Sequence, residues 1–190
     1  MRKQLIICSI AIVTGFSSCK EKKEEKIITV EQNHHEEPMD HNKEKNHDNM
    51  HHEETAALSF SDPKIANVYG HYIHIKKALV FTEAKEAKSG AKMLVKALSE
   101  VPNNEAALKE AKKIEASGDI EVQRVAFSPL SAEINKLIEG KITSGAVYKQ
   151  YCPMAFDFKG AYWLSSESEI KNPYFGDKML NCGEVKDTIQ

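Results

Sequence analysis

The sequence has no excess of either charge: its 26 Lys and Arg residues nearly balance its 28 Asp and Glu residues, for a net charge of −2. Strong general affinity for nucleic acid needs a basic face, so we expect no nucleic-acid partner. Beyond its N-terminal apolar stretch, the chain also lacks an apolar run of the about 20 residues that a transmembrane helix requires. It contains no Gly-rich phosphate loop and no HExxH, GxSxG or CxxCH motif. These absences predict that the protein is not an enzyme and carries no haem c.

Apolar residues are spread unevenly along the chain. Residues 5–16 are apolar, residues 20–55 are almost all polar, and residues 56–190 have the mixture of a globular domain. A unit of roughly 135 residues buries about two-thirds of its unfolded surface, which is enough for one core. We therefore expect a lipoprotein signal peptide at 1–18, a lipid-anchored disordered tail at 19–55 and one helical domain at 56–190.

The N-terminal segment has the pattern of a bacterial export signal. Arg2 and Lys3 form a positive region, and the apolar stretch Leu5–Val13 follows. Small residues then lead to Cys19, in an arrangement that resembles the lipobox of bacterial lipoproteins. The resemblance implies cleavage before Cys19, lipid on its thiol, and anchoring in the bacterial cell envelope, on the periplasmic face or the outer-membrane surface. The alternative is a plain cleaved signal that leaves Cys19 free or paired.

The polar tail contains six of the eight histidines, among many carboxylates. They are His34, His35, His41, His47, His51 and His52. Neutral imidazole is the commonest metal ligand, and short His-rich tracts are typical of metal binding. Without fixed spacing the tract should bind Cu(II) or Zn(II) weakly and unselectively, with Cu(II) favoured by the Irving–Williams order. The alternative is a hydrophilic linker of biased composition.

Residues 62–140 have the apolar spacing of helices. Asp62-Pro63 is a typical helix start, and Asp119 is placed to cap the last helix. Pro129 either kinks that last helix or follows a new cap at Ser128. Short loops between amphipathic helices favour antiparallel packing. The predicted fold class is all-α, an antiparallel bundle of about four helices with an irregular Cys/Met/aromatic C-terminal segment packed on it.

Soft sulfur ligands gather in the C-terminal segment, residues 151–185. Cys152-Pro153-Met154 lies near its start and Met179-x-x-Cys182 near its end, with turn residues between them. Thiolates and thioethers select Cu(I) among the metals of the envelope. If the segment folds back on itself, these four side chains form a Cu(I) site, and the only tryptophan, Trp163, can shield it.

The same two cysteines can form a disulfide instead. Cys8 is lost with the signal and Cys19 is used by the lipid, so Cys152 and Cys182 are the thiols of the mature chain. Disulfides persist outside the cytoplasm, and this one would add about 3–4 kcal/mol in the loop-entropy model. A redox-switched site, which admits metal only when reduced, combines the two. The residues alone leave all three possibilities open.

Several motifs resemble one uncharacterised domain family of bacterial envelope proteins, common in Bacteroidota. They are Ile75–Val80, Gln123–Phe127, Tyr148–Ala155, Gly160–Ser165, Asn172–Gly176 and Met179–Gly183. The resemblance covers residues 60–188, and the same domain occurs fused to periplasmic adaptor subunits of copper and silver efflux pumps. It implies an envelope lipoprotein that binds Cu(I) or Ag(I) for buffering, delivery or efflux, with such an adaptor or another envelope metal protein as partner. The alternative is a disulfide-pinned, non-metal interaction module that docks on an efflux or other envelope complex.

Overall fold

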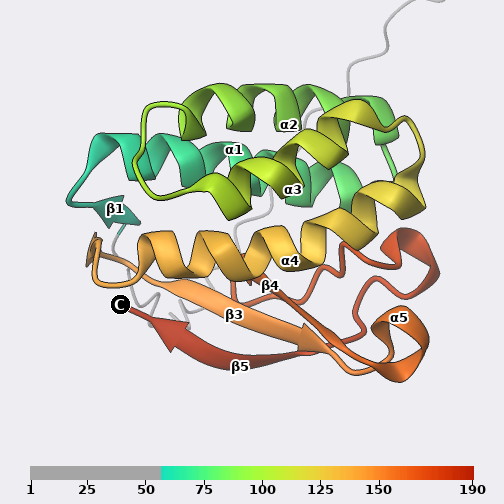
Figure 1. Ribbon diagram of the computed structural model, residues 1–190. Helices are drawn as coiled ribbons and strands as arrows, with labels where there is room; N and C mark the ends of the chain where they lie inside the picture. Colours follow the sequence, from blue (N-terminus) through green and yellow to red (C-terminus); the bar gives the residue numbers. More distant parts are fainter. Residues whose placement is uncertain (1–56) are drawn as a thin grey trace, which may run out of the picture. The chain divides into compact units, whose positions relative to one another are not determined.

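The computed structural model describes residues 57–190, so the expected signal peptide, Cys19 and the six tail histidines lie outside the described residues. The described domain contains four long helices and two small antiparallel sheets (Figure 1). The four helices were predicted, but the fold is not purely all-α. The C-terminal segment expected to be irregular contributes strands to a sheet.

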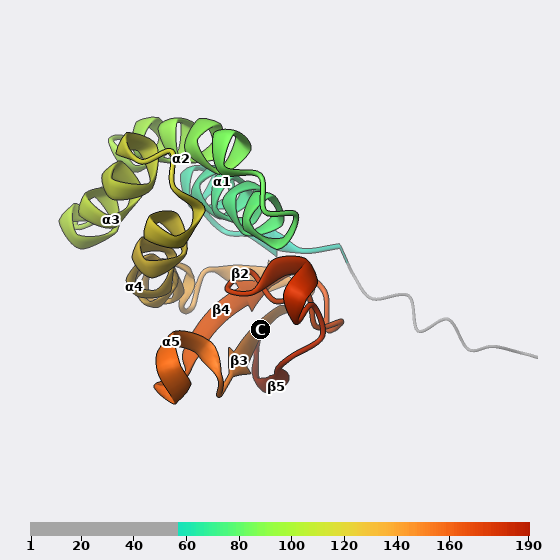
Figure 2. The same cartoon turned by 90° about the vertical axis from the view of Figure 1, so that its right-hand side faces the viewer.

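The helices begin close to the predicted caps. They are α1 (Pro63–Val80), α2 (Ala84–Leu98), α3 (Glu105–Ala116) and α4 (Ile120–Ile138). Asp62 accepts a hydrogen bond from the Lys64 amide at 2.8 Å, and Asp119 accepts one from the Glu121 amide at 2.8 Å. Each carboxylate satisfies an amide that has no partner inside its helix. Seen from the side, α2 and α3 lie on the far side of α1 and α4 from the larger sheet (Figure 2).

Helix α4 continues through Pro129 as one helix. The sequence had predicted either a kink at Pro129 or a new helix that starts at Ser128. Proline removes the amide that would bond to the carbonyl four residues earlier, which is that of Val125. Val125 is 59% exposed, so water can take the place of the missing donor. The proline therefore lies on the solvent side of the helix, where it disturbs the core least.

Two sheets follow the helices in the chain. Strands β3 (Val147–Cys152), β4 (Ala161–Ser165) and β5 (Glu184–Ile189) form an antiparallel sheet in the order β4-β3-β5. Strand β1 (Ser59–Phe60) pairs with β2 (Ile142–Ser144). The sequence analysis missed β5 because its side chains are almost all exposed and mostly polar. Its position is set by pairing with β3 rather than by a buried face of its own.

Tyr72 joins the larger sheet to the helices. Its hydroxyl on α1 accepts a hydrogen bond from the Leu164 amide of β4 at 2.9 Å and contacts the Ser131 hydroxyl of α4 at 2.8 Å. Its ring stacks on Phe127 with centroids 5.0 Å apart. The inner face of the sheet therefore shares one core with α1 and α4, which fixes where the C-terminal segment lies.

Candidate functional site

The structure brings the two cysteines together. Cys152 is the last residue of β3, and Cys182 lies two residues before β5 begins. Tyr151 of β3 pairs with Glu184 of β5 in the antiparallel ladder. Cys152 follows Tyr151 and Cys182 comes shortly before Glu184, so the two cysteines meet at this end of the ladder. The two Sγ atoms are 3.0 Å apart, and both cysteines are free thiols. Strand pairing thus turns a separation of 30 residues into direct contact.

The two thiols have different environments. Cys152 is fully buried, whereas Cys182 is half-buried at the edge of the sheet. The hydrogen bond with Cys152, together with burial, raises the pKa of the Cys182 thiol to about 11. The Cys182 thiol therefore holds its proton at neutral pH, and a bound metal ion has to displace that proton.

Asn172 fixes the chain that carries Cys182. It is fully buried, and its Nδ2 donates to the Cys182 carbonyl at 2.7 Å. Its Oδ1 accepts from the amides of Tyr174 at 2.8 Å and Phe175 at 3.3 Å. One side chain thus organises the Asn-Pro-Tyr-Phe-Gly turn and holds the neighbouring cysteine segment against it.

The residue after Cys182 has to be glycine. Gly183 has a φ of +147°, and a Cβ there would lie 2.8 Å from Cη2 of Trp163 and 2.9 Å from the Tyr151 carbonyl oxygen. Trp163 is fully buried on β4 and meets the Tyr174 ring edge-on, with centroids 5.9 Å apart. The indole therefore packs against the backbone at Gly183, the residue next to Cys182, and its expected shielding of a metal site stays a prediction.

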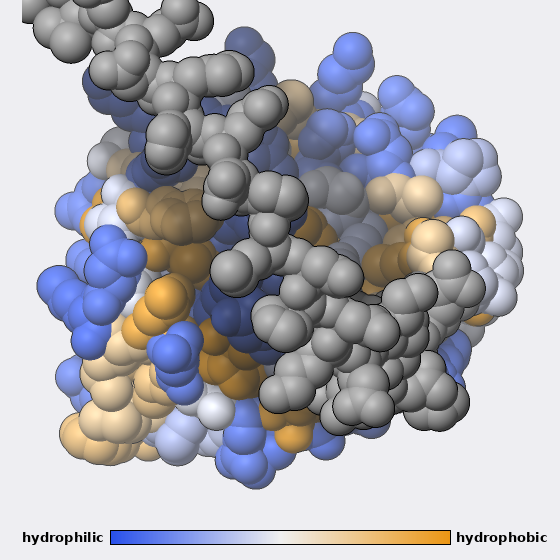
Figure 3. Space-filling view, turned by 180° about the vertical axis from the view of Figure 1, so that it is seen from behind, coloured by the Kyte–Doolittle hydropathy of each residue, from blue (hydrophilic) through white to orange (hydrophobic). Residues whose placement is uncertain are grey.

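Met154 and Met179 both line a pocket of about 510 Å³, which we call the thioether pocket. Neither cysteine lines this pocket, so the four sulfur-bearing residues predicted to form one site are divided between the cysteine contact and the pocket. The pocket has aromatic walls and both signs of charge. Its other lining residues are Phe156, Phe158, Tyr174, Phe175, Glu121, Arg124, Asp157 and Lys178. Apolar side chains reach the surface on the side of the domain that carries α5 (Ala155–Phe158) (Figure 3).

One wall of the pocket is a left-handed turn. Phe156, Asp157 and Phe158 all have positive φ, of 52°, 56° and 63°. Left-handed backbone costs non-glycine residues about 1–2 kcal/mol each, so three in succession store strain. Phe158 at the end of the turn is 77% exposed. Strain of this kind clusters at ligand sites and switch regions, which marks the turn as a functional candidate.

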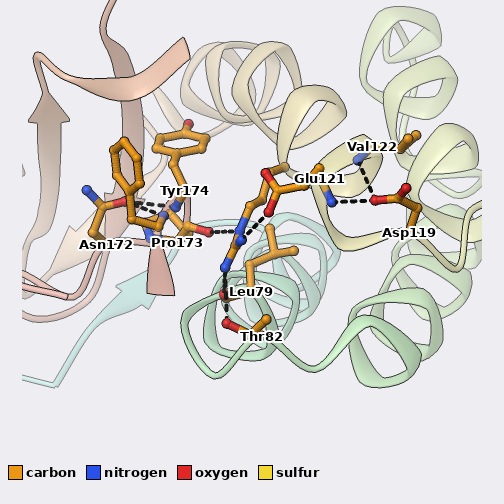
Figure 4. A network of polar contacts seen from close by, with 10 residues as sticks. Leu79, Thr82, Asp119, Glu121, Val122, Asn172, Pro173 and Tyr174 are labelled. Atoms are coloured by element: carbon orange, nitrogen blue, oxygen red, sulfur yellow. Dashed lines mark hydrogen bonds and ion pairs between the residues drawn. The ribbon is translucent and has the colours of Figure 1, made fainter. Parts of the chain in front are cut away.

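Arg124 on α4 lines this pocket and is almost fully buried. Figure 4 shows its partners Leu79, Thr82, Glu121 and Pro173. Its guanidinium donates to the Pro173 carbonyl at 3.0 Å, Glu121 Oε1 at 2.7 Å, the Leu79 carbonyl at 3.2 Å and the Thr82 hydroxyl at 3.1 Å. It therefore joins α1, α4 and the C-terminal segment. Four of its five N–H donors are used within the domain, so the main role of Arg124 is to support the pocket.

The histidines of the described domain do not form a metal centre. His71 and His74 lie on α1, and His74 Nε2 contacts Glu86 Oε1 at 2.5 Å. Burial, with a smaller effect of His74, lowers the pKa of His71. Between residues 57 and 190 there is no cluster of three or more His, Cys, Asp or Glu side chains that could hold a metal ion.

The sequence singled out the four sulfur-bearing residues, whose role as metal ligands stays a prediction, but it gave no role to the residues that position them. Arg124 and Asn172 lay in quoted motifs without an assigned role, and the left-handed turn was not foreseen. A lone arginine between apolar residues of a helix, as in Gln-Arg-Val-Ala-Phe, was the available signal for Arg124.

Comparison with known proteins gives one match. The family model described as "Protein of unknown function (DUF3347)" matches residues 68–145, which hold most of the four helices and β2. Both cysteines and both pocket methionines lie outside the matched stretch, whereas Glu121 and Arg124 of the pocket lie inside it. No curated protein and no solved structure matches the chain. None of the helices described here is long and apolar enough to cross a membrane. The match supports an uncharacterised domain of unknown function over residues 68–145.

Proposed function

We propose that the protein is an envelope lipoprotein that binds Cu(I) or Ag(I) through Cys152 and Cys182, for buffering, delivery or efflux. The observation that carries the proposal is the contact of two free thiols at 3.0 Å, from distant parts of the chain. Soft thiolates select Cu(I) over harder cations. The buried position of Cys152 would shield one side of a bound ion from water and oxidant.

The thiol pair needs only a small movement to hold a metal ion. Two sulfurs bound tetrahedrally at the about 2.3 Å typical of zinc lie about 3.8 Å apart. The Sγ atoms must therefore separate by somewhat less than 1 Å from their 3.0 Å contact. Cys182 is half-buried and can turn outward, whereas Cys152 is fixed in the core.

The remainder of the proposal concerns segments outside the described residues. Lipid on Cys19 would hold the protein on the envelope membrane, and the tail histidines would collect Cu(II) or Zn(II) weakly near it. The resemblance of residues 60–188 to domains fused to copper and silver efflux adaptors supports such an adaptor, or another envelope metal protein, as partner. No catalytic role is proposed.

The same geometry favours one competing function. Two sulfurs in contact need only oxidation to form a disulfide of about 2.05 Å. The protein would then be a clasped interaction module that docks on an envelope complex without metal. Thiol counting on the isolated protein distinguishes the two states.

A Cu(I) competition titration tests the proposal. We would use reduced residues 20–190, with the six tail histidines replaced by glutamine so that they cannot account for binding. We expect one equivalent to bind, and Cys152→Ser or Cys182→Ser to weaken binding by well over tenfold, which is 1.4 kcal/mol. Met93→Leu, on α2, is the control and should change nothing. Absence of binding by the reduced protein would leave the disulfide module as the function.

A further inference from the structure

The two methionines of the thioether pocket are placed differently from the cysteines. Met154 is 36% exposed on the pocket rim, whereas Cys152, only two residues earlier, is fully buried. On the other side, the Cys182 amide donates to the Met179 carbonyl at 3.1 Å and closes a turn that separates the two side chains. Each methionine is thus tied to its cysteine by a short stretch of chain, but the thioethers line a space that the thiols do not reach.

The surroundings of the thioethers suit a soft cation. The aromatic rings of Phe156 and Tyr174 meet edge-on, with centroids 5.2 Å apart, and form one wall. Aromatic faces attract cations, and thioethers are soft neutral ligands. The carboxylate of Asp157, which makes no ion pair within the described domain, lies on the same lining.

We propose that Met154 and Met179 form a second soft-cation site, separate from the cysteine pair and open to solvent, which receives Cu(I) or Ag(I) before the thiols do. The inference rests on the proposed function in taking these ions as cargo. Methionine has three rotatable side-chain bonds, so the two sulfurs can converge on one ion within the pocket.

The two sites differ in whether metal binding releases protons. A thioether carries no proton, so the ion enters the pocket without proton release. Passage to the cysteines is a ligand exchange with no change of oxidation state: the metal–thioether bonds break, metal–thiolate bonds form, and each thiol that binds gives its proton to solvent. Thiolates hold the ion more tightly than neutral thioethers, which gives the exchange its direction.

Methyl NMR with Ag(I) tests the site directly. Residues 20–190 carry five methionines, whose ¹³C-labelled methyl groups report separately. In the Cys152→Ser/Cys182→Ser variant, we expect the Met154 and Met179 methyls to shift together and to saturate at one equivalent. Met93 is the matched control, because it is 37% exposed on α2 and should not move with them. The tail methionines report any binding there separately.

Single substitutions then decide whether the two sulfurs act together. Met154→Leu should weaken the response of Met179 by more than tenfold, and Met179→Leu should do the same to Met154. Leucine keeps the volume, so folding should be preserved. The inference is overturned if Met154 and Met179 respond no more than Met93, or if each responds unchanged without the other.

The same data separate this inference from the proposed function. If the cysteines bind no Cu(I) but the Met154 and Met179 methyls shift together, the cysteine site is refuted and the thioether site stands. If the cysteines bind Cu(I) tightly but the Met154 and Met179 methyls do not shift, only the thioether site is refuted. If the double serine variant does not fold, the reduced wild-type chain is titrated to two equivalents, and the second equivalent should shift Met154 and Met179.

Discussion

Lys76 is a buried cation with no carboxylate partner. It is 3% exposed on α1, and its Nζ donates to the Ser165 hydroxyl at 3.5 Å. Among residues 57–190 it makes no ion pair. Burial therefore lowers its pKa from 10.5 to about 8. The unfolded chain binds this proton more tightly than the folded domain does, so this residue makes stability rise with pH between about 8 and 10.5.

Replacing Lys76 with methionine should remove that pH dependence. The cost of the buried charge is about 3 kcal/mol from the size of the pKa shift, and it is present in full below pH 8. We expect the stability difference between Lys76→Met and wild type to fall by about that amount as the pH rises to 10.5, measured by urea unfolding. Lys77→Met, which alters the exposed neighbour on α1, is the control and should show no such trend. A constant difference for Lys76→Met would contradict the prediction.

At the candidate site, the sulfur-bearing residues could be recognised from the sequence more readily than the residues that support them. Cysteine and methionine are recognised by their chemistry wherever they lie, so Cys152 and Cys182 were identified, and the structure brings them together. Asn172 and Arg124 act through carbonyls and amides far along the chain. Their roles depend on which backbone groups the fold brings near them, which no local pattern reveals.

Helices and strands differed in how well the sequence predicted them, because local interactions stabilise the helices whereas distant strand partners stabilise the strands. The helices combine a repeating apolar face with local caps such as Asp62 and Asp119, so they can be read from sequence. Strand β3 is buried irregularly on both sides and β5 is nearly all exposed, so neither shows a clean alternation. These strands exist because they pair with each other and because β4 is held against the helices.

The left-handed turn allows a direct measurement of strain. Asp157 is exposed, with φ 56° and ψ 50°, a conformation that costs glycine little. Asp157→Gly should therefore raise the free energy of unfolding by about 0.5–1 kcal/mol, which is about 2–4 °C in Tm for a domain of this size. Asp177→Gly is the matched control, because Asp177 is exposed in the 3-10 helix η1 (Gly176–Lys178) and has no positive φ, so glycine there should destabilise. A calorimetric scan in which both variants lose stability would show that the turn is unstrained.

At the scale of the domain, the structure implies that the helices and the sulfur-bearing segment unfold together. Arg124 on α4 bonds to the carbonyls of Leu79 and Pro173, which belong to the two parts. We call these two hydrogen bonds of Arg124 the clasp. Gly176, with φ of +57°, leaves room for the clasp, because a Cβ there would lie 2.9 Å from Arg124 Nη2. The aromatic contact of Phe127 with Tyr174, centroids 6.2 Å apart, runs beside it.

Removing the clasp should separate the two parts. Arg124→Met removes the donor to the Pro173 carbonyl and one of the donors to the Leu79 carbonyl, which keeps the Thr82 amide, so we expect a loss of about 2 kcal/mol. Circular dichroism follows the helices, while Trp163, the only tryptophan, reports on the buried sheet. In wild type the two urea transitions should coincide, as in two-state unfolding. In Arg124→Met the Trp163 transition should come first, because the segment loses its tie to α4 while the helical core keeps its own contacts. Lys136→Met, which breaks only an exposed ion pair on the same helix, should cost about 0.5 kcal/mol or less and keep the transitions together. Coincident transitions in Arg124→Met would mean that the shared aromatic core, rather than the arginine, couples the sulfur ligands to the helices.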